Sequence, residues 1–245
     1  MTAAANAFDT VAPRYGKLWD SNPVGMFQRR AVWRHIDRLF RPGDRILDLG
    51  CGTGVDALRL RSRGIRVHGI DGSAEMIRIS RAFGVASDQL PLDTLSKLRD
   101  RYDGALSNFG ALNCADNLQQ VASDLAQLIR SGGYAALCLM GPLCLWEILH
   151  FLLRGDKRAF RRLSPVAPSS LGIEVRYPDT RALIDAFRPH FNLTAWYGIG
   201  ICVPPSYVRN VKPLLSVLAA IDRVLSAMPV IRGLADHRLY IFRRL

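Results

Sequence analysis

Residues 44–71 read DRILDLGCGTGVDALRLRSRGIRVHGID, and this stretch decides the fold. It begins with a short apolar run at residues 46–49, of the kind that a buried parallel strand shows. Gly50, Gly52 and Gly54 then alternate with other residues, and a helical pattern follows. A second apolar run at residues 65–70 is followed by Asp71. The stretch therefore predicts one βαβ unit, with a glycine loop that lets main chain approach a bound ligand closely.

The spacing of the glycines indicates what kind of ligand the loop holds. The dinucleotide-binding fingerprint is G-x-G-x-x-G, whereas this loop reads G-C-G-T-G. Asp48 stands just before Gly50, where its charge would repel a pyrophosphate, so a ligand with a cationic end fits better. Asp71 follows the second strand, which is where nucleotide-binding folds place the carboxylate that accepts hydrogen bonds from ribose hydroxyls.

Together these residues resemble a known family. The runs DLGCGTG at residues 48–54 and GIDGSAEM at residues 69–76 are similar to the class I S-adenosylmethionine-dependent methyltransferases, in the small-molecule branch typified by ubiquinone and menaquinone methyltransferases. The resemblance is good over roughly residues 8–140 and holds in outline beyond them. It implies an α/β fold: a Rossmann-like, seven-stranded, mostly parallel sheet with helices on both faces, an antiparallel last strand and helical cap insertions.

The resemblance also implies which residues bind S-adenosylmethionine. Tyr15 matches a tyrosine of an N-terminal lid, and Met76 matches a position that packs on the adenine face, although a methionine there is otherwise simply core. Ala86 stands where the family usually has an acid for the adenine amino group, so that contact is absent, made by backbone, or supplied by Asp88. Cys51 is expected to pack in the loop and not to act as a nucleophile. The expected cofactor-binding residues are Tyr15, Asp48, Gly50, Cys51, Gly52, Gly54, Asp71, Gly72, Met76, Asp88, Asn108 and Phe109.

The length of the chain suits one α/β domain with an elaborated cap. We expect a single methyltransferase domain over residues 1–245. Its parts are an N-terminal helical lid (1–40), a cofactor-binding core (41–140), a segment that completes the core and carries substrate-cap insertions (141–236), and the last strand (237–245).

The formal net charge of +12 is high for an enzyme that acts on a small molecule. It favours an anionic partner, such as nucleic acid, a phosphorylated substrate or an anionic membrane, but solvated arginine-rich helix faces explain it equally well. No aromatic residues are regularly interleaved with the basic ones, as a base-stacking surface requires. Asn108 is followed by Phe-Gly and not by the Pro-Pro-aromatic run of DNA amino-methyltransferases, so we expect no specific nucleic-acid partner.

Cysteine usage and the N-terminal sequence bear on the compartment. The five cysteines form no C-x-x-C pair and are odd in number, which indicates reduced thiols. The sequence begins MTAAANAFD, without the basic start and apolar run of a signal peptide. We therefore expect a cytoplasmic protein. No cluster of residues has the spacing of metal ligands, so no metal is expected.

The cap segments indicate what the acceptor is like. Residues 142–153 are an apolar stretch too short to span a bilayer, and the basic run of residues 154–162 follows. Residues 131–133 are expected to turn the chain into a strand that begins at Tyr134. Beyond it, an inserted strand is expected at 172–177, residues 191–203 indicate one long strand, and residues 213–228 form a second amphipathic pattern. These features suit an apolar acceptor that is isoprenoid, quinone-like or lipid, either with an anionic group of its own or reached through peripheral contact with the anionic inner face of a membrane. The methylated atom (O, N or C) and the oligomeric state stay open.

Candidate catalytic residues follow from what methyl transfer needs. The acceptor atom must lie in line with the methyl carbon, and some acceptors must also lose a proton to a base. Glu147 and His150, three residues apart on a predicted helix, and His237 are the candidate bases, and the hydroxyl of Tyr207 would orient the acceptor. For each of them a structural or solvent-facing role is the alternative.

The function expected from the sequence is S-adenosylmethionine-dependent methyl transfer to an apolar small molecule by in-line displacement, with S-adenosylhomocysteine as the product. Two other functions are kept beside it. One is an S-adenosylmethionine-binding partner or regulatory protein that transfers no methyl group. The other is a nucleic-acid methyltransferase, which the net charge of +12 suggests.

Overall fold

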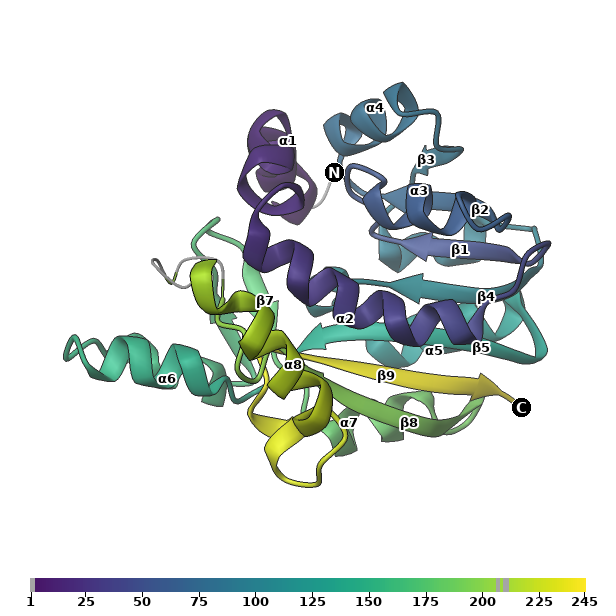
Figure 1. Cartoon of the computed structure of the whole chain (residues 1–245). Coiled ribbons are helices and arrows are strands. Elements are labelled where there is room, and N and C mark those ends of the chain that lie inside the picture. Colours follow the sequence, from purple (N-terminus) through teal and green to yellow (C-terminus); the bar gives the residue numbers. More distant parts are fainter. Residues whose placement is uncertain (1–2, 206–207, 209–211) are drawn as a thin grey trace.

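The computed structural model describes residues 3–205, 208 and 212–245 (Figure 1). In this part of the chain, seven strands form one sheet in the order β3-β2-β1-β4-β5-β9-β8. Their bounds are β1 Arg45–Leu49, β2 Arg66–Asp71, β3 Ser87–Gln89, β4 Tyr102–Ser107, β5 Ile129–Met140, β8 Phe191–Ile199 and β9 His237–Arg244. Strands β1 to β5 run parallel, and β9 pairs antiparallel with both β5 and β8. The predicted seven-stranded sheet with an antiparallel last strand is confirmed.

Helices cover both faces of the sheet, because its central strands are apolar on both sides. Their bounds are α1 Ala3–Tyr15, α2 Pro23–Leu39, α3 Val55–Arg61, α4 Ala74–Ala82, α5 Leu118–Leu128, α6 Leu145–Leu152, α7 Thr180–Phe187 and α8 Leu215–Leu225. Apolar residues of α2 and α3 pack on one face of the sheet, and those of α5 and α7 pack on the other. Side-chain caps begin several of the helices, and that of α4 is Ser73, whose oxygen accepts a hydrogen bond from the Met76 amide at 3.1 Å.

The structure corrects four expected boundaries. Strand β5 begins at Ile129 and not at Tyr134, because residues 131–133 form a bulge within the strand where a turn was expected. Strand β8 ends at Ile199, where Gly200 takes a positive φ of +76° and turns the chain, so the run 191–203 is not one strand. The apolar stretch 142–153 gives the shorter helix α6. The inserted strand expected at 172–177 is shorter.

That inserted strand, β7 (Glu174–Arg176), lies outside the main sheet. It pairs antiparallel with β6 (Val166–Pro168), which the sequence analysis did not foresee. Figure 1 shows α1, α6 and this hairpin gathered at one end of the sheet, the end toward which the arrows of β1, β4 and β5 point. The added elements therefore enclose the carboxyl ends of the parallel strands.

Candidate active site

A cavity of about 770 Å³ opens at the carboxyl ends of the parallel strands. Its walls come from α1, the glycine loop after β1, the end of β2, the loops after β3 and β4, the β6–β7 hairpin and the start of β9. The sheet order reverses beside β1, where β2 lies on one side and β4 on the other. Open α/β sheets bind ligands at such a switch point, so this cavity is the candidate active site.

The glycine loop gives the cavity its floor because its backbone needs residues without a Cβ. Gly50, Gly52 and Gly54 all have positive φ, at +67°, +52° and +87°. A Cβ at Gly50 would overlap the Cβ of Ala111, and one at Gly54 would come within 2.9 Å of Ser80 Oγ. A Cβ at Gly52 would meet no atom within 4 Å, and Gly52 lines the cavity. The first and third glycines are thus fixed by packing, whereas the second faces the space for a ligand.

This difference makes Gly52→Ala a test of ligand binding that is separable from stability. We expect the variant to lose about 1–2 kcal/mol of stability from the left-handed backbone, and to bind S-adenosylhomocysteine at least about tenfold more weakly because a methyl group occupies ligand space. Gly43→Ala is the matched control, since Gly43 has a φ of +93° and open space around it. Thermal melts and calorimetric titration give both quantities. Equal affinities in the two variants would contradict a ligand on the loop.

Asp71 ends β2 beside the glycine loop. Its Oδ1 accepts a hydrogen bond from the Ser73 amide at 2.8 Å, and its Oδ2 accepts one from the Gly52 amide at 3.0 Å. Burial raises the pKa of Asp71, and the two amides act against that rise. The carboxylate lines the cavity and keeps lone pairs for further donors, as a ribose would supply.

Acidic side chains outnumber cations under the loop. Asp48 is buried, and its Oδ2 has no hydrogen-bond partner among the described residues. Burial raises the pKa of Asp48 well above its ordinary value, and the charge of Asp56 adds to the rise. Arg29 is the cation of this group: it pairs with Asp56, and with Asp20 at 3.1 Å. Its guanidinium also lies 5.0 Å from the centre of the Phe109 ring. The charge of Asp71 also acts on Asp48, and burial raises the pKa values of Asp20, Asp48 and Asp71. A cationic ligand would favour the ionised forms of these carboxyls, so it is favoured there.

The N-terminal helix α1 closes over this end of the cavity. Tyr15 at its end is half-buried, lines the cavity and packs on Trp19, with ring centres 4.7 Å apart. Burial raises the pKa of Tyr15 to about 12, so its hydroxyl stays protonated at neutral pH. Asp9 Oδ1 accepts hydrogen bonds from Ser73 Oγ at 2.5 Å and from the Glu75 amide at 3.0 Å. Through Asp9, α1 is tied to the first turn of α4, next to Asp71.

The structure brings most of the expected residues to the cavity wall and leaves others away from it. The wall includes Tyr15, Gly50, Gly52, Asp71, Gly72, Met76, Asn108, Phe109 and His237. The residues that do not line it are Asp48, Cys51, Gly54, Asp88, Glu147 and His150. Tyr207 lies outside the described residues. Cys51 is packed against Gly69, and burial raises the pKa of its thiol, which agrees with a packing role.

Asp88 does not face the cavity. Its side chain is 61% exposed and pairs with Arg81 at 2.9 Å and with His68 at 2.9 Å, on the outer side of β3. The loop that follows this strand supplies Pro91, Leu92 and Asp93 to the wall instead. None of these three was among the residues expected to bind the cofactor.

Glu147 and His150, which the sequence offers as candidate bases, do not line the cavity. Glu147 is buried, and its carboxylate accepts hydrogen bonds from Arg161 at 2.6 Å and from Arg162 at 3.0 Å. Its carboxylate is taken up by the two guanidiniums and does not line the cavity, so Glu147 serves packing and charge pairing and not proton transfer. His150 Nδ1 lies 3.0 Å from Arg154 at the outer end of α6, and partial desolvation together with Arg154 lowers the pKa of His150.

His237 is the candidate base that reaches the cavity. It begins β9, its ring meets Phe109 edge to face at 5.2 Å, and its Nδ1 lies 3.4 Å from Asp236 Oδ2. Arg162 pairs with Asp236 at 2.8 Å, and also with Glu147. Burial would raise the pKa of Asp236, but the charges of His237 and Arg162 hold it well below its ordinary value. A buried chain of groups thus runs from Glu147 through Arg162 and Asp236 to His237.

The other end of the cavity is apolar with basic residues at its edge. The β6–β7 hairpin contributes Leu171, Ile173, Val175 and Tyr177 to the wall. Arg161 and Arg162 lie in the wall from η4 (Lys157–Leu163), and Arg176 lies there from β7, paired with Asp116 at 2.8 Å. This end suits a ligand with an apolar body and an anionic group.

Comparison with known proteins gives the family. The family described as methyltransferase domain matches residues 46–133. A ubiquinone/menaquinone biosynthesis C-methyltransferase UbiE of Geotalea daltonii is 30% identical over 51% of this chain and 58% of its own length. A demethylmenaquinone methyltransferase of Mycolicibacterium paratuberculosis is 29% identical over 74% of this chain and 81% of its own.

The fold agrees with these sequence matches. A putative methyltransferase solved in complex with the Haloferax volcanii Trm112 methyltransferase activator has a TM-score of 0.66 and 19% identity, covering 98% of this chain and 97% of that one. The domain match over residues 46–133, the methyltransferase relatives and the shared fold therefore support an S-adenosylmethionine-dependent methyltransferase.

Two further observations concern the described residues alone. Within residues 3–205, 208 and 212–245, no helix is long and apolar enough to cross a membrane. In the same ranges, no group of three or more His, Cys, Asp and Glu side chains is arranged to hold a metal ion.

Proposed function

We propose that this methyltransferase methylates an apolar small molecule that carries an anionic group, with His237 as the base. The observation that carries the proposal is the division of the cavity into two ends of different chemistry. The glycine loop and Asp71 line one end, and the apolar hairpin with its arginines lines the other. Phe109, in the loop after β4, and His237, at the start of β9, contact each other in the cavity wall.

The residues at the loop end fit S-adenosylmethionine. When bound, this cofactor would supply an electrophilic methyl group, which the acceptor atom would take in line while the sulfonium sulfur leaves as the thioether of S-adenosylhomocysteine. The positive charge of the sulfonium and amino groups would offset the burial that raises the pKa values of Asp48 and Asp71, and would be stabilised by their ionised forms. Asp71 would accept hydrogen bonds from the ribose. Tyr15 would close over the cofactor as part of the lid, and Met76 would pack on the adenine.

His237 would remove the acceptor proton. Asp236 lies 3.4 Å from the imidazole, and Arg162 in turn keeps Asp236 ionised. The alternative that His237 is only structural is less favoured, because its side chain lines the cavity. Arg161, Arg162 and Arg176 each pair with a carboxylate, and their remaining N–H groups would donate hydrogen bonds to the anionic group of the acceptor at the hairpin end.

The proposal predicts a kinetic defect without a binding defect in His237→Gln. Loss of a positioned base lowers kcat by about 10²–10⁴-fold, while S-adenosylhomocysteine affinity stays near that of wild type. Methyl-labelled S-adenosylmethionine is supplied with isoprenoid acids, long-chain acids and hydroquinones, each beside a neutral analogue of the same length. The best acceptor is then used for the variant.

His190→Gln is the control, since His190 lies on the turn before β8 and does not line the cavity. Methyl incorporation into no member of the panel, or into neutral analogues as well as acids, counts against the acceptor class. An unchanged kcat in His237→Gln counts against the base.

A further inference from the structure

Helix α6 has its carboxylate inside and its leucines outside. Glu147 is buried in its pairs with Arg161 and Arg162. The leucines of the other side recur at i, i+4, i+7 and i+8, which is the spacing of a face that normally packs on a core. All four are exposed: Leu145, Leu149, Leu152 and Leu153. Leu153 is 85% exposed, so this face has no partner within the described structure.

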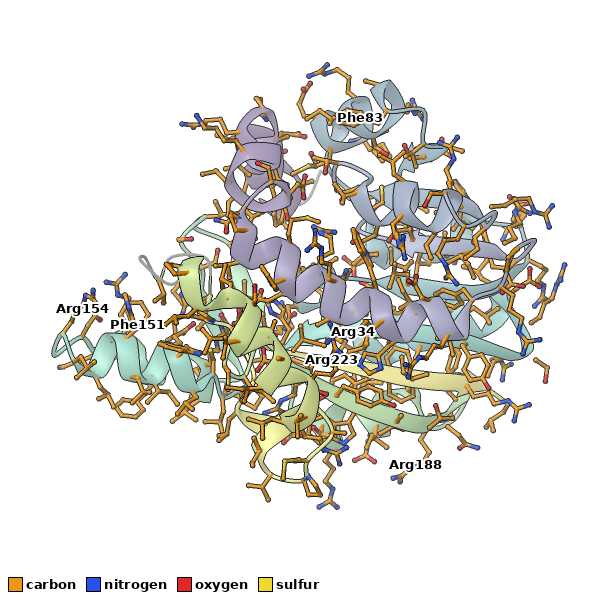
Figure 2. The ribbon with its side chains drawn as sticks, viewed as in Figure 1. Arg34, Phe83, Phe151, Arg154, Arg188 and Arg223 are labelled. Atoms are coloured by element: carbon orange, nitrogen blue, oxygen red, sulfur yellow. The ribbon has the colours of Figure 1, made fainter. Side chains whose placement is uncertain are left out.

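The exposed apolar surface continues into η4, which follows α6 in the chain. Phe160 and Leu163 of η4 are also more than half exposed. Figure 1 shows α6 projecting from the body of the molecule, and Figure 2 shows Phe151 and Arg154 near its outer end. We use the name α6 surface for the exposed residues of α6 and η4 and of the segment between them. Its apolar residues are Leu145, Leu149, Leu152, Leu153, Phe160 and Leu163, and its basic residues are Arg154, Lys157 and Arg158.

The α6 surface is positively charged. Residues 145–163 contain two acidic and five basic residues, and of the basic ones Arg161 and Arg162 face inward and pair with Glu147. Both acids are already engaged, since Glu147 is buried with two arginines and Asp156 pairs with Arg158 at 2.5 Å. Arg154, Lys157 and Arg158 are exposed beside the leucines. An apolar stripe bordered by cations is the composition of an element that lies in an anionic membrane interface.

We propose that the α6 surface docks on an anionic lipid bilayer, with its leucines and Phe160 entering the boundary of the acyl chains and its basic residues contacting the headgroups. Charge argues for this occupant over a second copy of the chain. Each copy carries a formal net charge of +12, so pairing two α6 surfaces would bring like charges together.

Docking would place the cavity near the lipid. Arg161 and Arg162 belong to η4 and also line the cavity, so one side of this segment faces the site while Phe160 and Leu163 face outward. An apolar acceptor dissolved in the bilayer would then reach the site without crossing bulk water. This last consequence rests on the proposed function, whereas docking itself does not.

Vesicle flotation tests the docking without acceptor or turnover. We expect the wild type to float with vesicles of phosphatidylcholine and phosphatidylglycerol and not with phosphatidylcholine alone. Binding should weaken as salt rises from about 0.1 M to about 1 M, where the screening length falls from about 10 Å to about 3 Å. Leu152→Ser/Leu153→Ser should lower the vesicle affinity about tenfold or more, because two apolar side chains no longer enter the lipid.

The double variant Val217→Ser/Ile221→Ser is the matched control. These two residues are exposed on α8, so the control removes a similar apolar area from another helix. All proteins are first shown to be folded by thermal melting and S-adenosylhomocysteine titration.

Three results would overturn the proposal. They are no flotation of the wild type with anionic vesicles, an equal loss in the α8 control, and a lipid-free dimer that Leu152→Ser/Leu153→Ser abolishes. A protein that methylates no tested acceptor would still float, so failure of the proposed function and failure of docking are distinguishable.

Discussion

Asp71→Ala should bind S-adenosylhomocysteine about 100-fold more weakly than the wild type, because hydrogen bonds to a charged acceptor contribute about 1.5–3 kcal/mol each. The carboxylate is positioned for two tasks. It holds the Gly52 and Ser73 amides, and it presents its remaining lone pairs to the cavity. Its loss therefore removes ligand contacts and releases the loop at the same time. Calorimetric titration of the purified variant measures the affinity.

Asp88→Ala is the control for this prediction. Asp88 also belongs to the carboxyl-end edge of the sheet, one strand further out, but its side chain is exposed and turned away from the cavity. We expect its affinity to stay within about twofold of wild type, since exposed ion pairs contribute only about 0–1 kcal/mol. If a folded Asp71→Ala keeps wild-type affinity, the ligand does not lie at the end of β2.

Arg162→Met should cost about 3–5 kcal/mol of unfolding free energy, because it leaves two buried carboxylates without their shared cation. Glu147 and Asp236 are both buried, and the guanidinium lies 2.8 Å from each of them. Chemical denaturation with urea measures the difference. Arg158→Met on the same segment is the control, since the Arg158–Asp156 pair is exposed, and we expect it to cost about 1 kcal/mol or less.

The loss of unfolding free energy in Arg162→Met, relative to the wild type, is expected to depend on pH. Arg162 and His237 hold the pKa of Asp236 below its ordinary value, so the ionised carboxylate stabilises the fold above the unfolded pKa of about 4. This contribution is lost as the pH falls toward the lower pKa of the folded state. The difference in unfolding free energy between the wild type and Arg162→Met should therefore be largest near neutral pH and shrink below about pH 4. A pH-independent difference would mean that the arginine acts through packing alone.

The cofactor end of the site could be predicted from sequence because its parts are close together along the chain. The glycine loop and Asp71 belong to one βαβ unit, so the spacing of their residues fixes their relation in space. Asp88 was misplaced for a local reason. Strand β3 has only three residues, and a side chain in so short a strand cannot be assigned to a face by alternation.

The acceptor end could not be predicted in the same way. Arg162 meets Asp236, a residue 74 positions later, and the pattern of neither segment indicates the other. On α6 the periodicity was even misleading. The leucine stripe has the spacing of a core face, yet the structure buries Glu147 on the opposite side, because two arginines from η4 neutralise it. Which side of an amphipathic helix faces the protein depends on such distant partners.

The position of β9 between β5 and β8 also determines the order in which this protein can fold during synthesis. Strands β1 to β5 are made in sequence and can pair with one another as they emerge from the ribosome. Strand β8 is made well before β9, but β9 is its neighbour in the sheet. Until β9 emerges, β8 and the open edge of β5 remain unpaired, and such edges are sites of mispairing with other nascent chains. The nucleotide half of the site can therefore assemble early, whereas Asp236 and His237 join it only after β9 has been synthesised and inserted.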